Sequence, residues 1–128
     1  MEQSYEGYYA RFETPSKEVG SLLMGADNLV GDDYQVDFRV EDGRVVVWLI
    51  NKFNAEMGYF GAVESRRLQL ANAKGQKIRA ILSFVAYSDE PEPGKYWGEM
   101  AVICFNPAYE KEMNAFADRV AQRMAEGI

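Results

Sequence analysis

The chain of 128 residues contains no histidine. Without an imidazole it cannot form a Ser–His or Cys–His catalytic pair, and it lacks the side chain that most catalytic zinc sites use. Its single cysteine, Cys104, cannot form an internal disulfide, which is typical of a reducing compartment. The sequence also lacks a P-loop, a paired-cysteine motif and the glycine pattern of dinucleotide-binding proteins. We therefore expect no metal ion and no cofactor.

Long apolar runs are missing too. No segment approaches the length of a membrane span, and the chain opens without the basic and apolar segments of a secretory signal. We expect a cytoplasmic protein that does not bind membranes. The net charge of −6 argues against nucleic-acid binding, because phosphate contacts require local cations. Residues 65–88 contain bases but no acid, which would suit a small anion or an acidic partner, or simply a solvated surface.

The residues that are present indicate a single domain, 1–128. Apolar residues make up 48% of the chain and aromatic residues 13%, enough for a core without disulfides. Alternating apolar residues predict strands at 5–13, 34–40, 44–50, 77–87 and 96–105, with weaker strand patterns over 51–64 and 67–70. Two helices are predicted after Thr14-Pro15 and Asn106-Pro107, because a capping residue followed by proline favours a helix start.

This element order predicts an α+β fold. We expect a curved antiparallel sheet of about six or seven strands, with a short N-terminal helix and a long C-terminal helix packed on one face. Residues 44–50 are apolar on both faces of the strand, so we expect cover on both sides. In residues 77–87 the alternation places Phe84 on the same face as Ile78 and Leu82. Residues 89–94, rich in proline, are expected to form a loop.

The order of elements resembles the helix-grip superfamily, which includes START-like lipid-transfer domains, plant pathogenesis-related proteins and small polyketide cyclases. The resemblance lies in the first strand and its proline-started helix, Tyr8 to Leu23, and in the closing strand and helix, Trp97 to Met124. It covers most of the chain in element order, without a sequence motif. It implies a cavity between the concave sheet and the long helix, which family members use for lipids, sterols and other apolar molecules. A TBP-like or cystatin-like fold has a similar order.

Large aromatic side chains on or beside the predicted strands are the candidate ligand contacts. Their rings offer apolar surface, and tyrosine and tryptophan add a polar group. Two charged residues join them, one because it interrupts an apolar strand and one because a guanidinium suits a carboxylate or phosphate. The candidate ligand-binding residues are Trp48, Tyr59, Phe84, Tyr87, Trp97, Glu99 and Arg79. The alternative interpretation is that the aromatics pack the core and that Glu99 faces water.

Three hypotheses about function follow. The first is a non-catalytic cytosolic domain that binds a small apolar ligand in a cavity between sheet and helix. The second is a protein–protein interaction module, either a homodimer or an acidic inhibitor of the immunity type, suggested by the acid excess in residues 1–64. The third is a histidine-free enzyme in which Glu99 and a tyrosine such as Tyr87 transfer a proton next to a carbonyl. The sequence assigns no catalytic residue.

Overall fold

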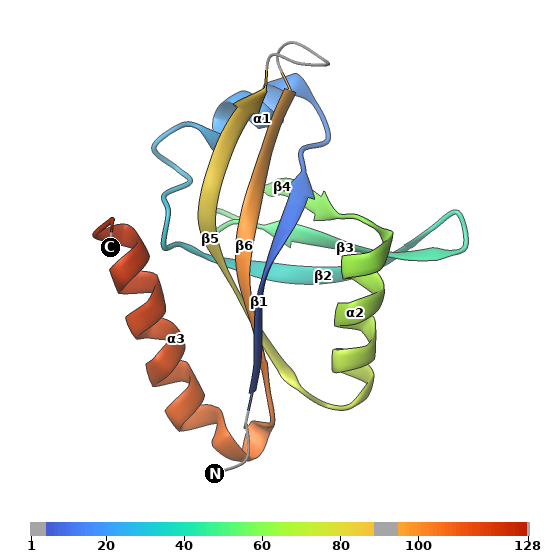
Figure 1. Ribbon diagram of the computed structural model, residues 1–128. Coiled ribbons are helices and arrows are strands. Elements are labelled where there is room, and N and C mark those ends of the chain that lie inside the picture. The colour runs from blue at the N-terminus through green and yellow to red at the C-terminus, as the bar shows by residue number, and fades with distance from the viewer. Residues whose placement is uncertain (1–4, 89–94, 128) are drawn as a thin grey trace.

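The computed structural model describes residues 5–88 and 95–127 of the chain. The expected loop at 89–94 lies outside the described residues. The elements are β1 (Tyr5–Glu13), α1 (Lys17–Leu23), β2 (Asp33–Glu41), β3 (Arg44–Ile50), β4 (Glu56–Phe60), α2 (Ala62–Ala73), β5 (Lys77–Ser88), β6 (Lys95–Phe105) and α3 (Glu110–Ala125). These strands form an antiparallel barrel in the order β1-β4-β3-β2-β5-β6, and α3 is the longest helix described (Figure 1). The fold is therefore α+β, as predicted.

The sheet closes into a barrel, whereas the sequence predicted a curved antiparallel sheet and gave no sign of closure. β1 closes it by pairing with β6 along its length and with β4 at its end, where Phe12 lies opposite Phe60. The fully buried ring of Phe12 packs against two glycines. A Cβ added at Gly98 or Gly58 would lie 2.3 or 2.5 Å from atoms of that ring. The closure thus depends on contacts between residues far apart in the chain, which local patterns do not reveal.

The two predicted helices do not share one face of the sheet. The long helix α3 packs on the outside of the barrel, where Met113 and Ala117 join Ile81 and Ile103 in one buried cluster. The short helix α1 instead contacts β6 and β4, and its Leu23 belongs to the interior cluster. Figure 1 shows the two helices at different sides of the barrel. A closed barrel fills its inside with its own side chains, so a helix finds apolar surface only outside or at an end.

Helix α2 replaces the strand patterns that the sequence suggested around residues 62–70. Its buried residues are Ser65, Leu68 and Ala71, so its buried side is mostly small or polar and shows little apolar periodicity. The hydroxyl of Ser65 accepts a hydrogen bond from the backbone N–H of Val47 at 3.1 Å. This places α2 beside the half of β3 that does not pair with β4.

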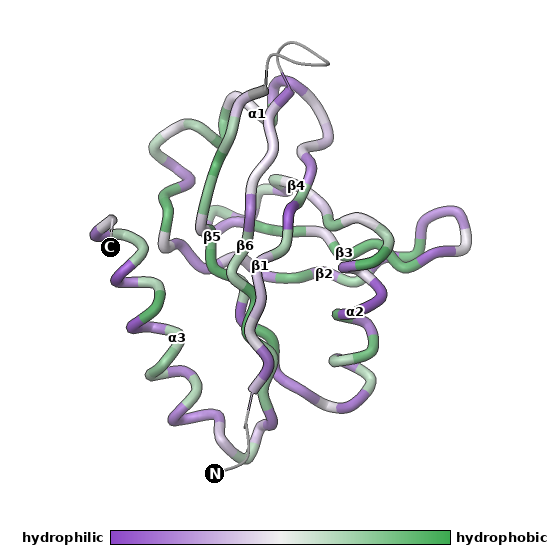
Figure 2. Tube along the Cα trace, viewed as in Figure 1, coloured by the Kyte–Doolittle hydropathy of each residue, from purple (hydrophilic) through white to green (hydrophobic). Residues whose placement is uncertain are grey.

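Side chains fill the barrel interior, with Phe12, Leu49, Met57 and Phe60 among the buried residues. Figure 2 shows apolar segments where the strands cross the barrel and hydrophilic residues at the β2–β3 tip. One face assignment was wrong. A bulge between Leu82 and Phe84 shifts the alternation of β5, so Phe84 turns outward and is 50% exposed.

Candidate functional site

Trp48 and Tyr59, two of the predicted ligand residues, form a pair on the outside of the barrel. Their rings lie 5.2 Å apart, and the guanidinium of Arg39 stands 4.9 Å from the ring of Trp48. The indole N–H of Trp48 donates a hydrogen bond of 2.7 Å to Glu41. These contacts leave Trp48 half-buried. The expected cover on both sides of residues 44–50 is therefore partial: Val47, Leu49 and Ile50 are buried, whereas Val45, Val46 and Trp48 are half-buried.

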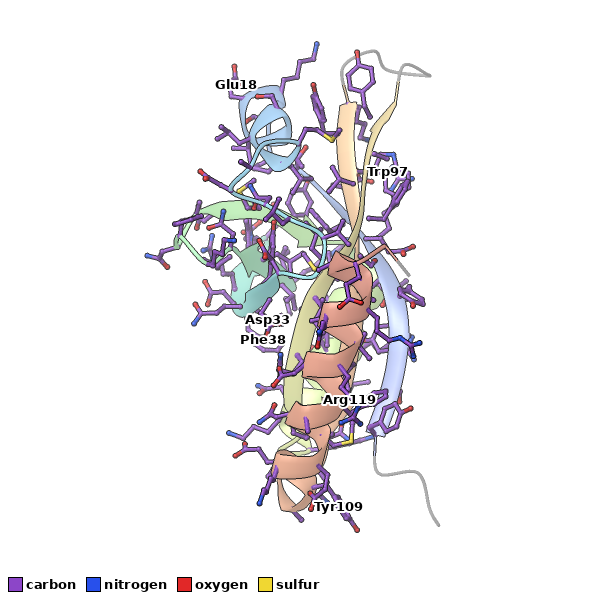
Figure 3. All side chains as sticks on the ribbon, turned by 90° about the vertical axis from the view of Figure 1, so that its left-hand side faces the viewer. Glu18, Asp33, Phe38, Trp97, Tyr109 and Arg119 are labelled. Atoms are coloured by element: carbon purple, nitrogen blue, oxygen red, sulfur yellow. The ribbon has the colours of Figure 1, made fainter. Side chains whose placement is uncertain are left out.

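Four further predicted residues lie along β5 and β6. The rings of Phe84 and Trp97 are 5.7 Å apart, and Tyr87 packs on Tyr96 at 5.0 Å. The carboxylate of Glu99 accepts a hydrogen bond of 3.1 Å from the hydroxyl of Ser83. The side view in Figure 3 shows Trp97 well away from Asp33 and Phe38. Trp97 lies opposite Glu13 of β1, and Glu13 lies opposite Tyr59 of β4, so strand β1 separates this group from the pair of Trp48 and Tyr59.

Arg79, the last predicted residue, connects three elements. Its guanidinium donates hydrogen bonds to Asp33 of β2 at 2.7 Å, and to Asn114 and Asp118 of α3 at 3.1 and 3.0 Å. Burial acts to lower the pKa of Arg79, but the two carboxylates outweigh it and leave the pKa raised. Because its guanidinium donates to acceptors on both β2 and α3, Arg79 holds α3 against the barrel.

The seven predicted residues thus lie in separate places and do not line one common cavity. Clusters of three or more acidic or cysteine side chains that could hold a metal are absent from the described part of the chain. Within residues 5–88 and 95–127, no helix has both the length and the apolar character needed to cross a membrane. Cys104 is buried, as a structural cysteine would be, and burial raises the pKa of its thiol to about 11.

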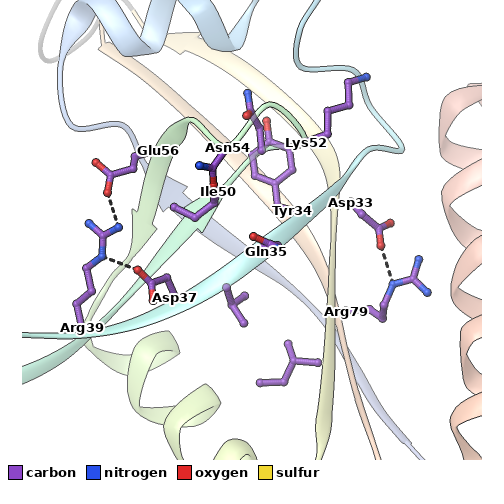
Figure 4. Close-up of a pocket in the computed structure, with 13 residues that line it drawn as sticks. Asp33, Tyr34, Gln35, Asp37, Arg39, Ile50, Lys52, Asn54, Glu56 and Arg79 are labelled. Carbon is purple, nitrogen blue, oxygen red and sulfur yellow. Dashed lines mark hydrogen bonds and ion pairs between the residues drawn. The ribbon is translucent and has the colours of Figure 1, made fainter.

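A groove lies around β2 (Figure 4). It has a volume of about 1280 Å³ and is open to solvent. Its lining comes from β2 between Asp33 and Arg39, from the β3–β4 connection between Ile50 and Glu56, and from Ile78 and Arg79 of β5. Apart from Arg79, the sequence interpretation did not single out this groove, because its walls come from segments far apart in the chain.

The charges in the groove largely neutralise one another. Its bases pair with carboxylates as follows: Arg39 with Asp37 at 2.8 Å and with Glu56, Lys52 with Asp32 at 3.1 Å, and Arg79 with Asp33 at 2.7 Å. Figure 4 shows the pairs of Arg39 and Arg79 at the two ends of the groove. A groove without excess positive charge is not built to attract a polyanion.

A buried polar network fixes the wall of the groove. The hydroxyl of Tyr34 and the side-chain amide of Asn51 both donate to the amide oxygen of Asn28, at 2.5 and 3.0 Å. Burial, with the nearby charge of Asp32, raises the pKa of Tyr34, so its hydroxyl remains a donor. The oxygen of Asn51 accepts two backbone N–H groups of the following turn. These hydrogen bonds therefore hold the side chains of Tyr34 and Asn51 in place in the wall of the groove.

The edge of β2 that faces the groove is open over most of its length. Pairing between β2 and β5 ends where Tyr34 lies opposite Ala80. The same register would bring Val36 opposite Ile78, but the two strands separate there, and residues 35–41 pair only with β3. Among the described residues, no strand covers this edge.

The register identifies the backbone groups on the open edge. The β2–β3 hairpin closes through Glu41 opposite Arg44, with positive φ at Asp42 and Gly43 as a two-residue turn requires. In an antiparallel ladder alternate residues bond to the same neighbour. Odd-numbered residues of β2 therefore bond to β3, and the N–H and C=O groups of Val36, Phe38 and Val40 point to the open edge. The side chain of Val40 is itself 75% exposed.

Comparison with known proteins adds a fold but no function. No protein-family model matches the sequence, and no curated protein matches it. The fold is similar to a crystal structure of a protein from Lactobacillus plantarum, a target of the Northeast Structural Genomics Consortium. The match has a TM-score of 0.52 and 9% identity, and covers 78% of this chain and 96% of that one. The resemblance to the helix-grip superfamily stays a prediction, since this neighbour does not concern that superfamily.

Proposed function

We propose that the protein is an interaction module that binds an extended segment of a partner protein by strand addition. The partner segment would lie in the groove and extend the sheet along β2. The observation that carries the proposal is the open edge of residues 35–41, with three residues whose backbone groups have no strand partner. In strand addition such main-chain groups supply the affinity, and flanking side chains supply the specificity.

The surroundings of the edge support this choice. The groove gives room beside β2, and its paired charges favour a ligand that binds through neutral backbone groups. The exposed side chain of Val40 offers apolar contact next to the same edge. A bare strand edge is also a liability for a protein, because it pairs readily with other chains. An open strand edge with an apolar side chain at Val40 is therefore better explained by a role in binding than as a feature without a function.

The hypotheses of a small apolar ligand and of an enzyme have less support. The candidate aromatic residues lie in separate groups, and buried side chains occupy the barrel interior. The enzyme hypothesis rests on Glu99, whose carboxylate is engaged by Ser83, while Tyr87 packs on Tyr96. Neither arrangement supplies an acid aimed into an apolar pocket.

The proposal is tested by removing one donor from the open edge. In Val40→Pro the lost N–H points away from β3, and proline is tolerated at a strand edge. We expect peptides selected from a displayed library on the wild type to bind Val40→Pro about tenfold more weakly or worse. The control Val40→Ala keeps the N–H and should retain binding. Equal binding to wild type and Val40→Pro, or a library that yields no binder, would count against the proposal.

A further inference from the structure

We infer that the strand added to β2 is β2 of a second copy of this chain, antiparallel across a two-fold axis at Phe38. The inference rests on the proposed function, because it names the occupant of the same edge. Two copies of one strand can pair about a two-fold axis only if the strand is self-complementary in backbone, charge and apolar surface. Residues 35–41 meet these three requirements in one register, as follows.

The backbone limits the choice of register. Only even-numbered residues of β2 direct N–H and C=O groups to the open edge, so even-numbered residues of the two copies must face each other. An axis at Asp37, Phe38 or Arg39 satisfies this condition. With the axis at Phe38, Phe38 faces its copy and Val36 faces Val40 on both sides. Each facing pair exchanges two hydrogen bonds, which gives about six in all.

The charges select among the three axes. An axis at Asp37 would place the two copies of Asp37 against each other. An axis at Arg39 would oppose the two arginines and would also place Asp37 against Glu41. The axis at Phe38 places Asp37 of each copy opposite Arg39 of the other, which makes two attractive pairs. Like charges directly opposite on a sheet destabilise it and opposite charges stabilise it, so the register at Phe38 is the favoured one.

The apolar face agrees with this register. Val36 and Phe38 pack partly against the interior cluster, while Val40 is 75% exposed in the single chain. Pairing about Phe38 covers Val40 with Val36 of the other copy. The space required lies in the groove beside Val36 and Ile78, where β2 and β5 separate. Figure 1 shows the β2–β3 hairpin projecting from the barrel, so its tip can reach a neighbouring molecule.

A charge exchange tests the register. We would follow the full-length wild type, Asp37→Lys and Arg39→Glu by sedimentation velocity over a concentration series. The wild type should dimerise, and each variant should raise the dimer Kd about tenfold, because each places two like-charged pairs across the axis. An equimolar mixture of the two variants should recover dimers, since the new lysine then faces the new glutamate.

The matched control is Arg11→Glu. Arg11 also stands over a tryptophan, 4.3 Å from Trp97, and also pairs with a carboxylate two residues away, but it lies on β1. This variant should dimerise like the wild type. Far-UV circular dichroism checks that each variant folds. If Arg39→Glu does not fold, Val40→Pro against Val40→Ala serves instead, and only the proline variant should be monomeric.

The outcomes separate this inference from the proposed function. If the wild type stays monomeric at every concentration, the inference that β2 pairs with a second copy is wrong. The same holds if the mixture of the two charge variants fails to associate. The proposed function survives either result if library peptides still bind the wild type and lose binding on Val40→Pro. It fails by its own test if the proline variant binds those peptides unchanged. Dimers that form in the wild type and are insensitive to both charge variants place the interface elsewhere.

Discussion

Phe12 and its two glycine neighbours hold the barrel shut, so a single methyl group there should be costly. In Gly98→Ala the new Cβ would lie 2.3 Å from the ring of Phe12, which is fully buried and cannot move away. We expect a loss of about 1–3 kcal/mol in the free energy of unfolding, measured by urea denaturation. Gly7→Ala is the control, because Gly7 is exposed on β1 and its nearest neighbour is the side chain of Tyr5 at 3.3 Å. Equal losses in both variants would contradict this packing argument.

Cys104 should make the stability of the protein fall at alkaline pH. Burial raises the pKa of its thiol from an ordinary 9.0 to about 11, so the folded chain keeps a proton that the unfolded chain releases. The protonated thiol makes its full contribution to the free energy of unfolding below pH 9. About 2 kcal/mol of that free energy is lost as the pH rises from 9 to 11. Unfolding of the wild type and of Cys104→Ala at several pH values measures the difference. The difference should shrink steadily across that range; a constant difference would disagree with a buried, protonated thiol.

Other side chains show how far the sequence predicts a site. The aromatic residues on the strands were identified, and Trp48 with Tyr59 do form a pair. Their position on the outside follows from which face of each strand the barrel encloses. A bulge turns Phe84 to the outer face of β5. Alternating apolar residues in the sequence do not show where a bulge lies.

Among the elements, α3 is attached to the barrel by charge contacts that Arg79 makes. Arg79→Ala removes the bonds to Asn114 and Asp118, and we expect a loss of about 1 kcal/mol, limited because Asp118 is 71% exposed. Amide hydrogen exchange should show faster opening in α3 than in β6. The control is Lys77→Ala on the same strand, whose contact with Glu110 is 3.9 Å long and exposed on both sides. If both variants loosen α3 equally, Arg79 does not hold it.

The secondary structure was predictable where capping and periodicity agreed. Asn106 accepts a hydrogen bond from the N–H of Ala108 and starts the turn that leads into α3, as its place before proline indicated. At the other start the cap is Ser16 rather than Thr14, and α1 is short, from Lys17 to Leu23. Helix α2 was missed because its buried side includes Ser65 and Ala71, which carry little apolar signal.

The molecule as a whole differs from the prediction in one decisive respect, the closure of the sheet. Closure brings β1 to β4, and within the closed barrel β5 pairs with β2 only at Asp33 and Tyr34. Both features depend on contacts between residues far apart in the chain, which a local sequence pattern does not reveal. The open edge at Val36, Phe38 and Val40 is a consequence of that short pairing, so the candidate site could be found only from the structure.

Amide hydrogen exchange along β2, followed by NMR, tests the open edge most directly. In dilute protein, where the chain is monomeric, the N–H groups of Phe38 and Val40 should exchange at least about tenfold faster than those of Asp37 and Arg39. Raising the concentration should slow the first pair and leave the second pair unchanged. The contradicting result is that Phe38 and Val40 already exchange as slowly as Asp37 and Arg39 in the dilute chain, since their edge would then be occupied without any partner.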